Sequence, residues 1–136
     1  MTYMIALKAE GSNPFYWYAL EDLIWDGNVP NNPDSSYIPH SEVVKSLNGL
    51  AYARGYPSAV WHWDIITDEN RAILRDFCPG ASAEVYISTR TNEIDVSGNE
   101  VFIDCLAIMN WPTGEEDQQV DKTLGLDITF THLVEV

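Results

Sequence analysis

The sequence has few basic residues. Seven lysines and arginines stand against 21 aspartates and glutamates in 136 residues, which gives a formal net charge of −14 at neutral pH. A surface with this charge repels phosphate backbones and anionic lipid headgroups, so the composition argues against binding to duplex DNA or to membranes through a basic patch. Most of these carboxylates are expected to keep the protein in solution.

The sequence also has few cysteines and no long apolar run. Cys78 and Cys105 lack the Cys-x-x-Cys spacing of structural zinc sites. We interpret them as two buried free thiols, with a disulfide between them as the alternative. No apolar run reaches the roughly 18 residues that a membrane helix needs, and the N-terminus lacks a basic segment followed by an apolar one. We therefore expect a soluble protein without an export signal.

Motifs of common catalytic and nucleotide-binding sites are absent. The sequence has no Gly-x-x-x-x-Gly-Lys-Ser/Thr, Gly-x-Gly-x-x-Gly, His-Glu-x-x-His or Gly-x-Ser-x-Gly. His62 and Asp64 share a strand face, a spacing that can orient a catalytic base, but without a third partner in the sequence we interpret them as a surface pair. Glu115, Glu116 and Asp117 lack the spacing of a calcium loop. We predict no enzymatic activity, no cofactor and no metal site.

Alternation of apolar residues indicates a β-rich chain. Trp61, Trp63 and Ile65 fall on one face of a predicted strand over 58–66, and two tryptophans on one face imply a substantial core. Residues 124–136 show the clearest alternation of all. Other extended segments are predicted over 2–9, 14–20, 42–54, 83–89 and 101–111, the last two joined as a hairpin with a turn at Ser97-Gly98-Asn99.

One short helix is predicted directly after residue 67. Thr67 can accept a backbone N–H as the N-cap, two acidic residues follow in the first turn, and a Pro-Gly pair stops the helix. Its apolar residues are expected to pack on a sheet, because a helix this short is marginal by itself. Arg71 and Arg75 are predicted to lie on a wetter face of the helix.

These elements predict a single domain over residues 1–136 that is mainly β with one short α-helix. Six or seven antiparallel strands are expected to form a β-sandwich or a half-open barrel with the helix on its flank. Such a sheet leaves open edges, and pairing between subunits is one way to satisfy them. The predicted core consists of Trp61, Trp63, Ile73, Leu74, Phe77, Trp111, Leu126, Ile128 and Phe130.

A long loop is predicted over residues 24–40, where three prolines and several Asn and Asp residues leave no periodicity. Loops of this length are uncommon in compact domains and are often functional. Trp25, Tyr37 and Ile38 lie within it. They lead to two interpretations, an arm that orders against a neighbouring subunit, or a loop that these side chains fix to its own domain.

The sequence from residue 47 onward resembles a known family. The matching residues are Gly49, Arg54-Gly55-Tyr56-Pro57-Ser58, Trp61, Trp63-Asp64, Leu74-Arg75, Phe77-Cys78, Asn110-Trp111-Pro112 and Phe130-Thr131-His132-Leu133. This pattern resembles the small tail structural proteins of long-tailed bacteriophages, the tail tube protein family. It consists of packing residues and contains no chemical motif.

The resemblance implies a virion structural protein that assembles in the host cytoplasm as a homo-oligomer. Proteins of this family form hexameric rings that stack into a hollow tube, which contacts other tail proteins and through which DNA passes without specific binding. On this interpretation the three side chains of the 24–40 loop are subunit contacts, and carboxylates line the lumen and repel DNA. The candidates for the lumen are the acidic residues of the predicted hairpin, Glu84, Glu93, Asp95 and Glu100.

Two alternatives remain open. A distal tail protein or a tail terminator would form a ring that caps or closes a tube instead of polymerising along it. A monomeric carbohydrate-binding β-sandwich belongs to a different class and needs exposed aromatic side chains that stack on sugar rings. Its candidate platform is Tyr16, Trp17, Tyr18 and Trp25.

Overall fold

The computed structural model describes residues 3–8, 17–23, 32–40, 42–45, 47, 49, 51–112, 117–119 and 122–136. Within these ranges the chain forms a main β-sheet, a separate two-stranded sheet, one α-helix and one 3-10 turn. The elements are β1 (Met4–Leu7), β2 (Tyr18–Ala19), η3 (Leu20–Asp22), β3 (Asp34–Ile38), β4 (Glu42–Lys45), β5 (Ala51–Arg54), β6 (Ser58–Thr67), α1 (Asp68–Arg75), β7 (Ser82–Ile94), β8 (Glu100–Asn110), β9 (Asp117–Gln119) and β10 (Lys122–Glu135).

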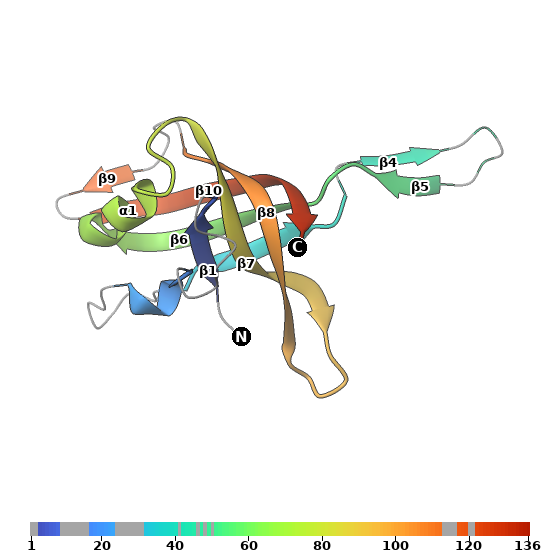
Figure 1. Cartoon of the computed structure of the whole chain (residues 1–136), viewed down its shortest axis with the longest axis horizontal. Helices are drawn as coiled ribbons and strands as arrows, with labels where there is room; N and C mark the ends of the chain where they lie inside the picture. The colour runs from blue at the N-terminus through green and yellow to red at the C-terminus, as the bar shows by residue number, and fades with distance from the viewer. Residues whose placement is uncertain are drawn as a thin grey trace.

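The main sheet is antiparallel and has the strand order β2-β1-β7-β8-β10-β6-β3, with β9 paired to the outer part of β10. Its longest hairpin is β7–β8, which extends beyond the body of the molecule and closes in a turn at residues 95–99 (Figure 1). Gly98 in this turn has φ 84°, a conformation that favours glycine. The predicted hairpin and its turn are therefore present.

The sheet curls until its two ends approach one another. The hydroxyls of Tyr3, which precedes β1, and of Ser35 in β3 are 2.5 Å apart. On the same side, the Asn92 side-chain amide donates a hydrogen bond to the Tyr37 carbonyl across 2.9 Å, so β7 also contacts the edge strand β3. Side-chain hydrogen bonds join these strands where no backbone pairing between them is present in the described residues. The predicted fold, a mainly β sandwich or half-open barrel with one helix, is confirmed.

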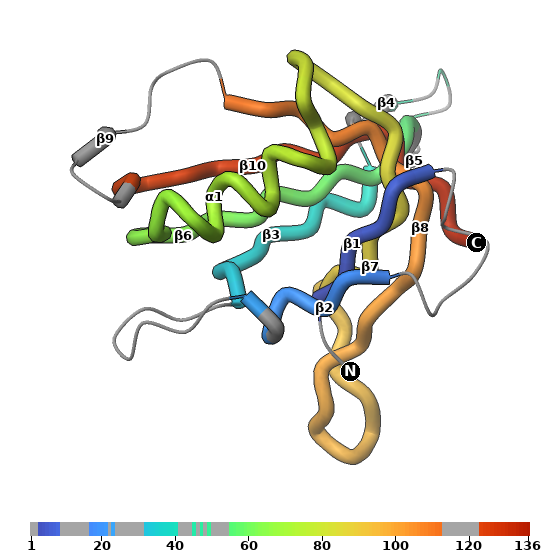
Figure 2. Tube along the Cα trace, turned by 60° about the vertical axis from the view of Figure 1, so that its left-hand side comes forward, coloured from blue at the N-terminus to red at the C-terminus, as the bar shows by residue number. Residues whose placement is uncertain are grey.

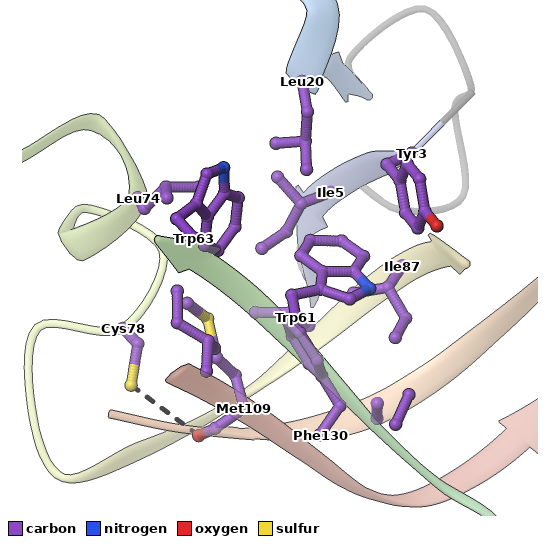
Figure 3. Close-up of a cluster of buried hydrophobic side chains, with 14 of the residues drawn as sticks. Tyr3, Ile5, Leu20, Trp61, Trp63, Leu74, Cys78, Ile87, Met109 and Phe130 are labelled. Atoms are coloured by element: carbon purple, nitrogen blue, oxygen red, sulfur yellow. Dashed lines mark hydrogen bonds between the residues drawn. The ribbon is translucent and has the colours of Figure 1, made fainter. Parts of the chain in front are cut away.

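The core lies inside this curl. Trp61 is fully buried between Tyr3 and Phe130, with ring centroids 5.6 and 4.5 Å away, and Trp63 packs edge-on against it at 6.3 Å (Figure 3). Edge-to-face contacts of this kind add stabilisation beyond the buried area. Among the predicted core residues, those that are buried are Trp61, Trp63, Leu74, Trp111, Leu126, Ile128 and Phe130, while Ile73 and Phe77 pack half-buried against them.

Helix α1 begins as its sequence predicts. Thr67 is extended, and its hydroxyl accepts a hydrogen bond from the Asn70 backbone N–H. The helix lies along β6 (Figure 2) and inserts the fully buried Leu74 into the core. Arg71 and Arg75, which were predicted to lie on a wetter face, are intermediate in burial, and their guanidinium groups lie over the ring of Trp111.

Two predictions about the first half of the chain are wrong. The loop predicted over 24–40 contains β3, whose residues Asp34–Ile38 pair with β6 from His62 to Ser58. Cross-strand pairing with a tryptophan-rich strand overrides a local sequence rich in proline and asparagine. Residues 42–54 were expected to be one long extended segment, but they form the β4–β5 hairpin, with Gly49 at φ 87° in its connection.

One face assignment in β6 is also wrong. Ile65 is partly exposed, whereas its neighbour Ile66 is buried, so the alternation set by Trp61 and Trp63 changes at this point. On β10 the partners of Ile65 and Trp63 are Leu124 and Leu126, and Gly125 between them has φ 69°. The backbone of the partner strand is therefore irregular next to the position where the alternation of β6 changes.

Candidate subunit interfaces

The β4–β5 hairpin is an arm that leaves the body of the molecule. Its register pairs Glu42 with Arg54 and Lys45 with Ala51, and in the described residues neither strand pairs with the main sheet. Gly55, at φ 92°, turns the chain from the arm into β6. Figure 1 shows the arm extending away from the body on the side where β10 ends. The backbone edges of both strands are thereby held away from the core.

Apolar side chains are exposed around the base of this arm. We call Ile38, Tyr56 and Val134 the base patch; each is about half exposed, and Tyr56 reaches 58%. The Tyr56 ring contacts the His132 ring at a centroid distance of 5.5 Å. His132 has φ 55° and lies at a shift in the β10–β8 register, so the strand is bulged where it meets Tyr56. The base patch therefore lies beside a bulge of β10 whose backbone is left-handed at His132.

The structure describes two of the three predicted subunit contacts of the 24–40 loop, and it places these two differently. Ile38 is exposed and belongs to the base patch. Tyr37 is half-buried against the core of its own chain, and this burial raises the pKa of its hydroxyl. Trp25 lies outside the described residues. Of the two that are described, Ile38 is therefore the one available to a neighbour.

The four acidic candidates of the β7–β8 hairpin are all exposed, but they do not lie together. Glu84 is near the start of β7, where it pairs with Lys8. Glu93, Asp95 and Glu100 lie at the opposite end of the hairpin. There Asp95 accepts hydrogen bonds from the backbone of the turn, and Glu100 lies 3.2 Å from Arg90. The hairpin carries a cluster of three carboxylates, of which Glu100 pairs with Arg90, and a separate carboxylate, Glu84, which pairs with Lys8.

The end of this hairpin also carries exposed apolar side chains. Ile94 is 61% exposed, and Val96 in the turn is fully exposed. The neighbouring residues Asp95, Gly98 and Glu100 line a hollow of about 490 Å³ that reaches back to Phe102. Apolar groups at the end of a projecting element gain free energy when another surface covers them.

Cationic and aromatic side chains meet at the other end of the same hairpin. Trp111 directly follows β8, and the guanidinium carbons of Arg71 and Arg75 lie 5.4 and 4.9 Å from its ring centroid. Arg75 also donates to the Gly80 carbonyl across 3.1 Å, which fixes its position over the ring. Cation–π contacts of this geometry are electrostatically favourable. In a chain with seven basic residues, two of them share one indole.

His62 has more partners than the sequence indicated. One ring nitrogen bonds to Asp127 on β10 and the other lies 2.6 Å from Asp64, while Asp34 of β3 is its backbone partner on the opposite side. Hydrogen bonds to Asp127 and then to Asp64 raise the pKa of the imidazole. Asp127 was missed because it is 65 residues away in sequence. No group of three or more His, Cys, Asp or Glu able to hold a metal ion occurs in the described part of the chain.

The aromatic platform considered for sugar binding is only partly described. Trp17 contacts Tyr86 at 5.8 Å and Tyr18 contacts Phe77 at 6.2 Å, so both rings are half-buried within the chain. Tyr16 and Trp25 lie outside the described residues. Among the aromatic side chains that the structure describes, Tyr56 alone is exposed.

Comparison of the chain with protein-family models, with curated proteins and with solved structures gives no match. Within the described ranges, no helix has the length and apolar character needed to cross a bilayer. The proposals below therefore depend on this chain's own residues and geometry.

Proposed function

We propose that this protein is a structural subunit of a bacteriophage tail that assembles into rings and stacks into a tube conducting DNA. The observation that carries the proposal is the β4–β5 arm, a two-stranded sheet that in the described residues has no strand of its own domain beside it. The family resemblance in the sequence supports the same class. No catalytic role is proposed.

An arm of this kind needs a neighbour. A two-stranded hairpin by itself is marginally stable in water, because it buries little surface and leaves both edges unpaired. Lys45 and Leu47 are exposed along it. A second copy of the chain is the partner that is always present, and the base patch beside the arm offers it exposed apolar area. We therefore propose that the arm of one copy packs on an adjacent copy.

The charge of the chain suits a DNA conduit. With a net charge of −14, the subunit repels the phosphate backbone, and DNA passing along its surface would not be retained. Three exposed carboxylates, those of Glu93, Asp95 and Glu100, lie at the turn end of the hairpin, where Glu100 pairs with Arg90. This group is a better lumen candidate than the single carboxylate of Glu84, which pairs with Lys8.

The first experiment is assembly of the purified full-length protein. Static light scattering over a concentration series, with negative-stain electron microscopy of the same samples, would reveal rings or hollow tubes if the proposal is correct. Single rings of fixed size that never stack would favour the terminator or distal tail role. A protein that stays monomeric at the highest concentration would contradict the proposal, and its retention on an oligosaccharide matrix would then test the sugar-binding class.

A shortened arm separates assembly from folding. Glu42 and Arg54 are cross-strand partners, so residues 43–53 can be replaced by an Asn-Gly pair that closes a tight turn. The main sheet is expected to keep its unfolding midpoint in urea, while rings and tubes are lost. A variant that assembles like the full-length protein would exclude the arm as the contact.

A further inference from the structure

A row of apolar side chains crosses the outer face of the main sheet. Residues directly opposite one another in an antiparallel pair share a face. The register therefore aligns Tyr86 on β7 with Leu106 on β8, and Leu106 in turn with Val134 on β10. Ile108 follows Leu106 by two residues along β8, so it lies on the same face. We call these four residues the outer patch.

The outer patch faces away from the core. The residues that alternate with it on β8, Cys105 and Ala107, are buried inside the curl, whereas three of its own members are half-buried and Val134 is 49% exposed. At one end the Tyr86 ring contacts Trp17 of the same chain. At the other end Val134 is shared with the base patch. The outer patch therefore extends the base patch across the sheet from β10 to β7.

The outer patch and the arm carry opposite charges. Asp104 is exposed and precedes Leu106 by two residues, which places it on the same face of β8, at the border of the outer patch. On the arm, Lys45 and Leu47 are exposed. In the described part of the chain, neither Asp104 nor Lys45 has a salt-bridge partner. Each surface thus combines apolar area with one charge, and the two charges differ in sign.

The arm points away from the outer patch of its own copy. Within the described ranges β4 and β5 pair only with each other. Figure 1 shows the arm extending from the body in the direction away from β7, β8 and β10. An arm that covers an outer patch therefore covers that of another molecule.

We propose that the arm of one copy docks on the outer patch of a second copy, with Leu47 against Leu106 and Val134 and with Lys45 beside Asp104. This inference rests on the proposed function and identifies the surface that receives the arm. Because the arm and the outer patch are different surfaces, the contact is head-to-tail. Such a contact closes into a ring when the rotation between successive copies divides a full turn.

Charge favours the arm over a second outer patch as the occupant. Two outer patches packed face to face would bring two Asp104 carboxylates together, in molecules that each carry a net charge of −14. Like charges repel across such an interface. The arm instead brings a lysine to the border of the patch and an apolar side chain to its centre, which is the usual arrangement of a polar rim around an apolar contact.

The test reverses each charge separately in the full chain. Lys45→Asp and Asp104→Lys each place like charges in the proposed contact, so each variant alone should form rings or tubes only at about tenfold or higher protein concentration than the wild type. Both side chains are exposed, so the urea unfolding midpoints should not change. K122D and D76K make the same charge changes at the start of β10 and at the end of α1, and both controls should assemble like the wild type.

Mixing the two variants then tests the contact itself. In an equal mixture of K45D and D104K, the aspartate arm of one variant meets the lysine patch of the other, and the lysine arm meets the aspartate patch. Every contact between unlike copies is again between opposite charges, so the mixture should assemble near the wild-type concentration. Light scattering with negative-stain electron microscopy measures this recovery.

The outcomes separate this inference from the proposed function. Weak assembly of each variant with recovery in the mixture would support the arm–patch contact. Variants that assemble like the wild type, or a mixture that assembles no better than its components, would overturn this inference and leave the proposed function standing. A wild type that does not assemble at all would overturn both.

Discussion

The Trp61 indole N–H donates a hydrogen bond to the Thr89 hydroxyl across 3.0 Å in the buried interior. Trp61 is on β6 and Thr89 on β7, two strands that are separated by β8 and β10 in the sheet order. The bond therefore crosses the inside of the curled sheet and ties its two halves together. Both residues are fully buried, which makes the bond costly to break.

Replacing Thr89 by valine is expected to destabilise the fold. The change keeps the side-chain shape and leaves the Trp61 N–H buried without its partner, at a cost of about 1–3 kcal/mol in the free energy of unfolding. Equilibrium urea denaturation measures this cost. The double variant T89V/W61F should lose less than the sum of the two single variants, because Phe has no N–H to satisfy. Strictly additive losses would show that the bond contributes nothing.

The stability contributed by His62 is expected to fall as pH rises. Its pKa is raised above 6.5 by hydrogen bonds to Asp127 and then Asp64, so the stabilisation is fully present below the unfolded-state pKa and is lost as pH rises through the folded-state pKa. The His62 side chain is 35% exposed, and solvent screening keeps the contribution under about 1 kcal/mol.

His62→Gln should therefore lower the urea midpoint at about pH 5 and have no electrostatic effect at about pH 9. His40→Gln serves as the control for replacing a histidine elsewhere. A cost for H62Q that is equal at both pH values would contradict protonation as its origin.

The left-handed backbone at His132 predicts a difference between two substitutions. His132→Ala loses the contact with the Tyr56 ring and keeps a non-glycine residue at φ 55°. His132→Gly loses the same contact but relieves the steric cost of that conformation, about 1 kcal/mol. Thermal unfolding should therefore show H132G to be more stable than H132A. The reverse order would mean that the bulge carries no strain.

Both thiols are expected to be unreactive in the folded protein. Cys78 and Cys105 are buried and unpaired, and burial raises the pKa of Cys105 to about 12. An aromatic disulfide reagent at about pH 8 should label neither thiol until denaturant is added, because the thiolate is the reactive form. A cysteine placed by S97C in the exposed turn is the positive control. Rapid labelling of the native wild type would contradict the buried positions.

Local sequence determined much of this protein. The alternation over 58–66 and 124–136 predicted two strands, which the structure pairs with each other, and the Thr67 cap predicted the start of α1. The buried tryptophans followed from the same pattern. These features depend on period and on capping within a few residues, so they can be recognised in a single segment.

Tertiary structure alone decided the rest. Strand β3 exists because β6 pairs with it, and the nearest carboxylate of His62 besides Asp64 is that of Asp127, 65 residues away on β10. Arg71 and Arg75 cover Trp111 because this residue, directly after β8, lies beneath the helix. Long-range strand pairing determines which residues become neighbours. Composition and periodicity do not show which distant residue will lie next to a given side chain. Local patterns predicted the long strands β6, β7, β8 and β10 and the helix, whereas the curl of the sheet brought together the charges and rings that meet.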